Sequence, residues 1–327
     1  MRKVGRAVVF AKTTGITREQ WLRLRAGGIG GSDIPKIAGV STWGNQLTTY
    51  LDKIDPLRDD GEQSEAAAIG VAVEELVAKL WQERNPGLKL RRVNAILQHP
   101  EHPWALANVD RIVLDAKTNE VVGIYEGKSG GIKAPWENDA IPDAYYLQGQ
   151  WYLGVTGLPR IYYGALLGGY GGMAIATREA AADPELITDL FTIGASFWQL
   201  VQDRTPPAID GSPLSDEVLK HLHPEAHMGE VVELPPQGAL LAAALLDAKV
   251  AAKVAAEEEN RLANELKLLV GDAERATCPG FRLSWTNVTT NRLDGKALKE
   301  AHPELHAQFT KPSQSRRFTC AQERDRG

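Results

Sequence analysis

Two opposite charges stand two residues apart in the segment VVGIYEGKSG, residues 121–130. The β-branched and aromatic residues before them favour an extended, pleated backbone, so this segment is predicted to be a strand. Side chains at positions i and i+2 of a strand point to the same face, so Glu126 and Lys128 should lie side by side. A surface salt bridge, which is common and weak, is one interpretation of such a pair. A catalytic site is the other, and it requires further polar residues that converge on these two.

A third charge interrupts the apolar segment WALANVDRIVLD, which lies just upstream. The turn residues 116–120 predict that this segment and the strand after it pair as an antiparallel hairpin, which brings Asp110 close to Glu126. Fifteen residues lie between the two carboxylates, and this Asp, Glu-x-Lys spacing is typical of a metal-dependent nuclease site. Two carboxylates and the main-chain carbonyl of Gly127 can hold a hard divalent cation, which prefers oxygen ligands. Lys128 can then orient or help deprotonate the attacking water and offset the charge that grows on the phosphorane.

Two more polar residues occur in apolar helical patterns. Glu74 lies in the middle of a predicted helix, on a stripe that should face the sheet, whereas its neighbour Glu75 is expected to be solvated. Solvation is also the alternative interpretation for Glu74. Gln148 lies within YYLQGQWYL, where the surrounding aromatic residues should pack inward, so its amide needs a polar partner. A hydrogen bond to the main chain within the core is the alternative for Gln148.

A glycine-rich turn, GGIGGSD at residues 27–33, is the fourth feature with possible chemistry. Ser32 is the expected N-cap of a helix that runs through Ile37, and Arg25 precedes the turn. A helix N-terminus can bind a phosphate through its free N–H groups and its dipole. Capping without any ligand is the alternative, because such turns are common.

Hydrophobic periodicity and turn residues predict the elements that position these side chains. Helices are expected from Thr17 to Gly27, over 46–53, 65–84, 139–155, 182–203, 237–270 and 294–308. Strands are expected over 88–97, 104–115, 120–128, 160–167, 172–177 and 316–319, with a hairpin at Pro279-Gly280. This order predicts an α/β domain with a central mixed sheet flanked by helices, residues 1–228, followed by a C-terminal arm, residues 229–327, with a long helix, a hairpin and a further helix.

Composition restricts the class of protein. The chain has 327 residues, of which 43% are hydrophobic, and a net charge of −5, which argues against a protein that coats nucleic acid non-specifically. An enzyme that confines positive charge to a groove remains compatible. No apolar run is long enough for a membrane span, and the N-terminal AVVF is too short for a signal peptide, so a cytoplasmic protein is expected. The two cysteines have no metal-ligand spacing and are expected to be buried or neutral thiols.

Several motifs together resemble the YqaJ-type viral recombinases. They are RAGGIGGSDIPKIAGVSTWGNQLTTYLDK, GVAVEELVAKLWQE, HPEHPWALANVDRIV, IYEGKSG and IPDAYYLQGQWYLGVTG, in this order. That family belongs with lambda exonuclease to the PD-(D/E)XK nuclease superfamily, so the resemblance implies a restriction-endonuclease-like core. It covers roughly residues 20–205, and the C-terminal segment from residue 280 also looks like that of many phage members.

The resemblance implies a 5′-to-3′ exonuclease of the alkaline exonuclease type. Such an enzyme hydrolyses one strand of linear duplex DNA with Mg²⁺ or Mn²⁺, expected as two ions per site, and leaves a 3′ overhang. By their match to the family motifs, the implied catalytic residues are Asp110, Glu126, Lys128, Glu74 and Gln148. The implied metal ligands are Asp110, Glu126, Glu74 and the carbonyl of Gly127, and the implied 5′-phosphate pocket consists of Arg25 and Ser32.

The resemblance also implies partners and a setting. The implied partners are duplex DNA ends with a 5′-phosphate and a single-strand annealing protein. The implied assembly is a ring-shaped homotrimer, and no membrane partner is expected. The expected setting is the bacterial host cytoplasm, with a phage or prophage as the source of the gene. One departure concerns Val109 and Arg111, which stand where the family commonly has proline before and glycine after the aspartate.

Two other functions fit parts of the same pattern. An endonuclease of the same superfamily, such as a restriction or repair enzyme, would share the catalytic residues, but it has no use for a terminal phosphate pocket at Arg25 and Ser32. A catalytically idle DNA-binding or assembly protein would be free to lose Asp110, Glu126 and Lys128, all of which are present. The sequence therefore favours the exonuclease.

Overall fold

The chain forms two units, which the computed structural model describes over residues 3–57, 65–130, 136, 140–169, 172–223, 225–311 and 316–322. The first unit extends to Leu219 and the second begins at Lys220. The division at residues 228 and 229 predicted from the sequence stays a prediction, because two spatial units need not fold independently.

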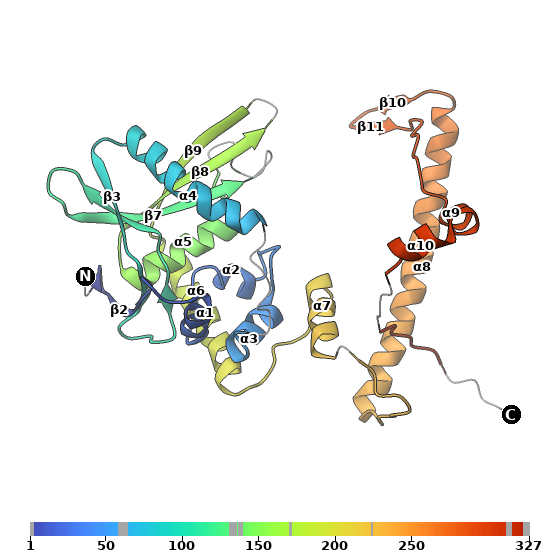
Figure 1. The fold of residues 1–327 in the computed structure, drawn as a ribbon, viewed down its shortest axis with the longest axis horizontal. Helices are drawn as coiled ribbons and strands as arrows, with labels where there is room; N and C mark the ends of the chain where they lie inside the picture. The colour runs from blue at the N-terminus through green and yellow to red at the C-terminus, as the bar shows by residue number, and fades with distance from the viewer. Residues whose placement is uncertain are drawn as a thin grey trace. The chain divides into compact units, whose positions relative to one another are not determined.

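A five-stranded mixed sheet is the centre of the first unit (Figure 1). In spatial order its strands are β3 (Leu88–Arg92), β6 (Arg111–Asp115), β7 (Val121–Gly130), β8 (Arg160–Gly169) and β9 (Gly172–Ala181). Strands β7 and β8 are parallel and are connected through helix α5 (Asp143–Thr156), whereas the other neighbours are antiparallel. The predicted mixed sheet and the predicted hairpin of β6 and β7 are therefore confirmed.

Helices cover both faces of this sheet, and the alternation of residues along each strand decides what faces them. Helix α4 (Glu65–Arg84) contributes Trp81, which packs with Val113 and Tyr125 in a small cluster on one face. The next residues along the strands, such as Ile124, point to the opposite face and join the main core with α5. In Figure 1, α4 and α5 can be followed across the strands of this sheet.

A second, four-stranded antiparallel sheet lies in the same unit. Its strands are β1 (Lys3–Val4), β2 (Ala7–Lys12), β4 (Ala95–Gln98) and β5 (Leu106–Ala107). The prediction of one strand over 88–97 was wrong, because its two halves pair in different sheets. Asn94, with φ of 49°, lies in the left-handed region between them and redirects the chain. The predicted strand 104–115 is likewise divided into β5 and β6, and Asp110 occupies a bend directly before β6.

Four further helices of the first unit follow the predicted boundaries closely. They are α1 (Arg18–Ala26), α2 (Ile34–Ile37), α3 (Gln46–Ile54) and α6 (Pro184–Gln202). Helix α7 (Pro213–Leu222) was not predicted from the sequence. The capping box of Thr17 and Gln20 at the start of α1 is confirmed. Helix α5 starts at Asp143, later than the predicted residue 139, which itself lies outside the described residues.

The predicted apolar stripe of α4 is only partly buried. Val77 is buried at 1% exposure, but Ile69 and Leu76 are 53% and 49% exposed. The buried residues of α4 are instead Val77, Ala78 and Trp81, because the C-terminal half of the helix packs against Tyr125 and its neighbours. The apolar pattern therefore predicted the helix correctly but its buried face incorrectly.

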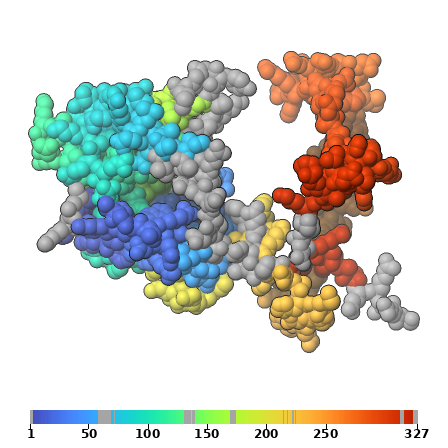
Figure 2. Space-filling view, viewed as in Figure 1, coloured from blue at the N-terminus to red at the C-terminus, as the bar shows by residue number. Residues whose placement is uncertain are grey.

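The second unit is built on α8 (Pro236–Val270), a continuous helix of 35 residues with no buried side chain. The hairpin of β10 (Arg275–Cys278) and β11 (Phe281–Ser284) follows it. In the space-filling view, the orange and red residues form a slender body along this helix (Figure 2). The predicted long helix and hairpin are confirmed. Among the described residues, no helix has the length and apolar character that a membrane crossing requires.

Two predictions for the second unit were wrong. The helix expected over 294–308 is divided into α9 (Gly295–Ala301) and α10 (Pro303–Phe309), because Pro303 lacks an N–H and cannot continue a helix. Residues 316–319 form no strand, and Arg316 instead donates a hydrogen bond to the carbonyl of His223 at 2.9 Å. Cys278 is exposed, so of the two alternatives expected for the cysteines, buried or neutral, burial does not apply to it.

A buried histidine closes the loop between β4 and β5. The Nδ1 atom of His99 accepts hydrogen bonds from the main-chain N–H groups of Glu101 and His102, each at 3.1 Å. An accepting Nδ1 requires a neutral ring whose proton is on Nε2. Burial, with contributions from Arg6 and His102, lowers the pKa of His99 to about 4.

This histidine should make the protein sensitive to acid. The pKa of His99 is about 6.5 in the unfolded chain and about 4 in the folded one, so its stabilising contribution is complete above pH 6.5 and is lost as the pH falls through 4. At about 1.4 kcal/mol per pKa unit, the loss is at most about 3 kcal/mol. His99→Asn keeps an acceptor oxygen but does not titrate, so urea unfolding should show a smaller loss of stability between neutral and acidic pH. His227→Asn, at an exposed site, is the control, and equal losses in all three proteins would contradict this assignment.

Candidate active site

Glu126 and Lys128 lie side by side on β7, as their spacing predicted. Lys128 Nζ donates a hydrogen bond to Glu126 Oε1 at 2.9 Å, and only 14% and 6% of the two side chains are exposed. Burial alone would lower the pKa of Lys128, but the adjacent carboxylates of Glu126 and Asp110 raise it, so the lysine is protonated. Because the pair is buried, it differs from the weak surface salt bridge that was the alternative interpretation.

The amide of Gln148 completes a three-membered cluster with this pair. Its Nε2 donates to Glu126 Oε1 at 2.8 Å, and its Oε1 accepts from Lys128 at 2.9 Å. Nε2 also donates to the hydroxyl of Tyr152 at 3.0 Å. The polar partners that the sequence required for Gln148 are therefore side chains of the site.

Asp110 approaches the cluster from the bend before β6. Its Oδ2 accepts a hydrogen bond from the main-chain N–H of Gly127 at 3.0 Å. Burial, followed by the negative charge of Glu126, raises the pKa of Asp110 to about 8. The two carboxylates thus repel each other's charge, which a proton or a metal cation would relieve.

Glu74 reaches the same region from α4, and Arg111 holds it. Arg111 Nη1 donates to Glu74 Oε1 at 2.9 Å, and Nη2 donates to Glu75 Oε2 at 2.8 Å. Glu74 is half-buried, with 30% of its side chain exposed, whereas Glu75 is 70% exposed. Glu75 is therefore solvent-accessible as predicted, but it is also ion-paired, to Arg92 as well as Arg111.

These residues line a cavity of about 360 Å³. Its charged lining residues are Glu74, Asp110, Glu126 and Lys128, so the cavity is acidic. Glu126 Oε2 is buried and has no hydrogen-bond partner within the described part of the chain. The unpaired Glu126 oxygen lies beside Asp110, whose pKa is raised, and this arrangement suits a hard cation. The donor set would be Asp110, Glu126 and the Gly127 carbonyl. Among the described residues, no three Asp, Glu, His or Cys side chains lie close enough together to hold a metal ion by themselves.

A second, basic cavity of about 230 Å³ lies at the glycine-rich turn. Arg25 Nη2 donates to Ser32 Oγ at 2.7 Å and to Asp33 Oδ1 at 3.2 Å, so the structure brings the two predicted residues together. The guanidinium of Arg25 also stacks over Trp21, 4.7 Å from its ring centroid. The charged residues that line the cavity are Arg18, Arg25, Lys36 and Lys53 with Asp33 and Asp52, a net positive charge that suits an anion.

The predicted capping role of Ser32 was wrong. Asp33 is the N-cap residue of α2, and α2 has only four residues, Ile34–Ile37. A single turn has almost no macrodipole, so an anion at this turn would depend on the cationic side chains rather than on the helix.

Sequence reasoning missed the centre of this cavity, the buried pair of Asp33 and Lys53. Lys53 Nζ lies 2.6 Å from Asp33 Oδ2, and their side chains are 3% and 5% exposed. Asp33 Oδ2 also accepts from the N–H of Gly30 at 2.8 Å, and Lys53 donates to the carbonyl of Arg25 at 3.2 Å. Lys53 and Arg25 hold the pKa of Asp33 well below its usual value, although burial alone would raise it. A lysine on the apolar side of α3 was the one signal in the sequence.

Tyr152 contacts both the acidic cluster and the glycine-rich turn, although it lines neither cavity. Its hydroxyl accepts the hydrogen bond from Gln148, and its ring packs so closely on Gly31 that a Cβ there would lie 2.3 Å from Cε1. Glycine at this position of the turn is therefore required by the ring. One aromatic side chain spans from the acidic cluster to the glycine-rich turn.

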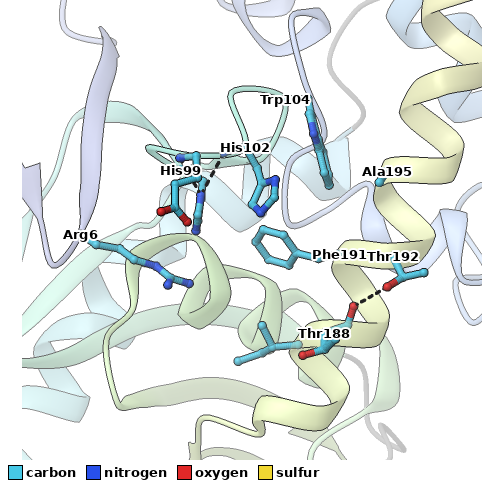
Figure 3. A pocket seen from close by; sticks show the side chains of 10 residues that line it. Arg6, His99, His102, Trp104, Thr188, Phe191, Thr192 and Ala195 are labelled. Atoms are coloured by element: carbon cyan, nitrogen blue, oxygen red, sulfur yellow. Dashed lines mark hydrogen bonds between the residues drawn. The ribbon is translucent and has the colours of Figure 1, made fainter.

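A third cavity, of about 470 Å³, lies between the His99 loop and α6 (Figure 3). It is lined by Arg6, His99, Glu101, His102, Trp104, Ile187, Thr188, Phe191, Thr192 and Ala195. In Figure 3, Arg6 extends from one side and Phe191 from the other. Glu101 is the one carboxylate among these residues and none of the predicted site residues lines this cavity, so the acidic cavity is the better candidate for metal chemistry.

A family model and a relative of similar length match this chain. Residues 20–159 match the model of the YqaJ-like viral recombinase domain. The uncharacterized protein YqaJ of Bacillus subtilis is 34% identical over 322 residues, which cover 96% of this chain and 97% of the relative. An alkaline exonuclease from Laribacter hongkongensis covers 57% of this chain and 93% of its own, with 16% identity and a TM-score of 0.44. A phage-related exonuclease from Haemophilus somnus covers 54% and 96%, with 16% identity and a TM-score of 0.36.

The buried pair at the glycine turn should be essential for stability. Asp33→Asn leaves Lys53 buried without a counter-ion, which should cost about 3–5 kcal/mol of unfolding free energy. Glu19→Gln is the matched control, because Glu19 and Arg23 form an ion pair at 2.8 Å that is more than half exposed. That change should cost less than about 1 kcal/mol. Urea unfolding of the two variants measures the difference, and similar small losses would show that Asp33 does not anchor the turn.

Proposed function

We propose that this chain, which belongs to the YqaJ-like viral recombinase family, is a metal-dependent exonuclease that digests one strand of linear duplex DNA from the 5′ end. The observation that carries the proposal is a pair of cavities of opposite charge, with Tyr152 in contact with both the acidic cluster and the glycine-rich turn. The acidic one suits a metal ion and the basic one suits a phosphate. An enzyme that acts at a DNA end needs both within a short distance.

In this proposal Asp110, Glu126 and the carbonyl of Gly127 hold Mg²⁺ or Mn²⁺. The bound ion would lower the pKa of a water molecule and offset the charge of the phosphoryl group. Lys128 is protonated and points at Glu126, so it can orient the water by donating a hydrogen bond and can stabilise negative charge on the phosphate. Gln148 fixes the position of both side chains through its two hydrogen bonds.

Arg25 and Ser32 would bind the 5′-phosphate. A terminal phosphate carries more charge than a phosphodiester, so a cavity with excess positive charge distinguishes an end from the middle of a strand. Arg25 is 26% exposed, which leaves its guanidinium accessible to a ligand. With the terminal phosphate held there, the first phosphodiester can reach the acidic cavity. This preference for an end is the feature that favours an exonuclease over an endonuclease of the same superfamily.

The resemblance to the YqaJ-type recombinases and lambda exonuclease supports the finer parts of the proposal. The product would be a 3′ overhang for a single-strand annealing protein, and three copies would form a ring around the duplex. Light scattering on the full chain measures the number of copies directly. A catalytically idle assembly protein remains the other alternative, and the intact cluster of Glu126, Lys128 and Gln148 argues against it.

Removal of the metal or of the lysine should stop the reaction. Excess chelator should abolish release of nucleotides from linear duplex DNA, and Lys128→Ala should slow it at least about a hundredfold, because the charge that stabilises the reacting phosphate is lost. Lys89→Ala is the control, since Lys89 is an exposed lysine on β3 with no part in the cluster. Undiminished release in excess chelator would exclude a metal-dependent mechanism.

The polarity of digestion tests the basic cavity. Duplex with a 5′-phosphate should be digested at least about tenfold faster than the same duplex with a 5′-hydroxyl, because the cavity gains charge-assisted hydrogen bonds to the phosphate. Arg25→Ala should remove most of that difference while the need for metal stays. Arg23→Ala, on the same helix but paired with Glu19 at the surface, is the matched control. Equal rates on the two ends for the wild-type protein would favour the endonuclease alternative.

A further inference from the structure

Arg111 is a buried cation with no role in the proposed mechanism. It directly follows Asp110, and 4% of its side chain is exposed. Its guanidinium lies over the ring of Tyr125, 5.9 Å from the centroid, and forms two hydrogen bonds to carboxylates of α4. Since the family resemblance leads to an expectation of glycine at this position, the side chain is a feature of this chain that requires its own explanation.

The partners of Arg111 point to a role at the metal site. A buried guanidinium is stable only when carboxylates compensate its charge, so Arg111 and Glu74 fix each other. Glu74 also lines the acidic cavity, together with Asp110 and Glu126. Without Arg111, Glu74 would keep only its longer contact to Arg92, at 3.9 Å, and could serve as a ligand of a second metal ion beside Asp110.

The charges of the cavity fit one divalent ion. Glu74, Asp110 and Glu126 are compensated in part by Lys128 and Arg111, which leaves one negative charge when all are ionised. One divalent cation and the single negative charge of a bound phosphodiester bring the total to zero. A second divalent cation would add two positive charges next to a buried guanidinium, and like charges at such short range repel strongly.

We propose that Arg111 takes the place of a second metal ion, so that this site works with one divalent cation. Arg111 is a positioning residue: it supplies positive charge and holds Glu74, whereas Asp110 and Glu126 bind the ion. This inference rests on the proposed nuclease function and differs from the two ions that the family resemblance implies.

The number of bound ions tests the inference directly. Mn²⁺ is titrated into the full-length wild-type protein, both alone and with a 5′-phosphorylated duplex whose phosphorothioate linkages resist cleavage. Isothermal titration calorimetry should give one ion per chain in both cases, and electron paramagnetic resonance should show an isolated ion. Two ions per chain, or the spectrum of a coupled pair, would overturn the inference even without any variant.

Variants test the assignment to Arg111. Arg111→Gln removes the charge, so a second Mn²⁺ should bind at least tenfold more tightly than to the wild type, and the added change Glu74→Gln should abolish it. Glu75→Gln is the matched control, because Glu75 touches Arg111 but is exposed and does not line the cavity; it should still bind one ion. A folded Arg111→Gln protein with one ion would refute the role of Arg111. If that variant does not fold, the number of Mn²⁺ ions bound per wild-type chain decides whether the inference holds.

The outcomes separate the inference from the proposed function. A wild-type protein that binds two ions and digests DNA ends would retain the function and lose the inference. A protein that binds one ion but digests no DNA under any metal would lose the function.

Discussion

The burial of the Glu126 carboxylate is the constraint on which the rest of the site depends. A buried carboxylate is costly unless cations and hydrogen-bond donors compensate it. Here Lys128 and Gln148 both bond to one oxygen, Oε1, and the other oxygen has no partner among the described residues. The half-satisfied carboxylate leaves an open position for a cation next to Asp110. The fold must therefore bring a strand, a bend and a helix together at one point.

The mixed sheet meets this requirement through the alternation of its strands. Glu126 and Lys128 point to the face that α5 covers, which brings Gln148 to them, whereas Tyr125 points to α4. The antiparallel hairpin returns the chain so that Asp110 lies beside Gly127. On the same helix, Tyr152 lies one helical turn after Gln148, and its ring contacts the glycine-rich turn. Helix α5 thus contacts both the acidic cluster and the glycine-rich turn.

Local patterns were sufficient to predict most of the elements and the acidic cluster. The i and i+2 rule placed Glu126 and Lys128 on one face, and the turn between the strands placed Asp110 near them, because both depend only on the geometry of adjacent residues. The pattern of α4 fixed its ends at Glu65 and Arg84 but not its buried face, since that depends on how the helix packs on the sheet.

Long-range features could not be read from the sequence. The pairing of Asp33 with Lys53 joins a turn to a helix that begins later in the chain, and no local pattern distinguishes a buried lysine from a solvated one. The distribution of residues 88–98 between two sheets depends on which strands are available as partners, although Asn94 marks the point of change. Arg111 was noticed as a departure from the family, but its contact with Glu74 became visible only when α4 and β6 were placed together.

The most direct test of the central claim compares linear and closed-circular forms of the same DNA. Each form is incubated with the full-length protein and Mg²⁺, and the products are separated by chromatography and by gel electrophoresis. When the linear form carries a 5′-phosphate on one strand only, an enzyme that starts from a phosphorylated 5′ end should release mononucleotides from that strand, leave the complementary strand intact and not change the circle. Fragments of the circular DNA, or equal loss of both strands of the linear DNA from their 3′ ends, would contradict the account.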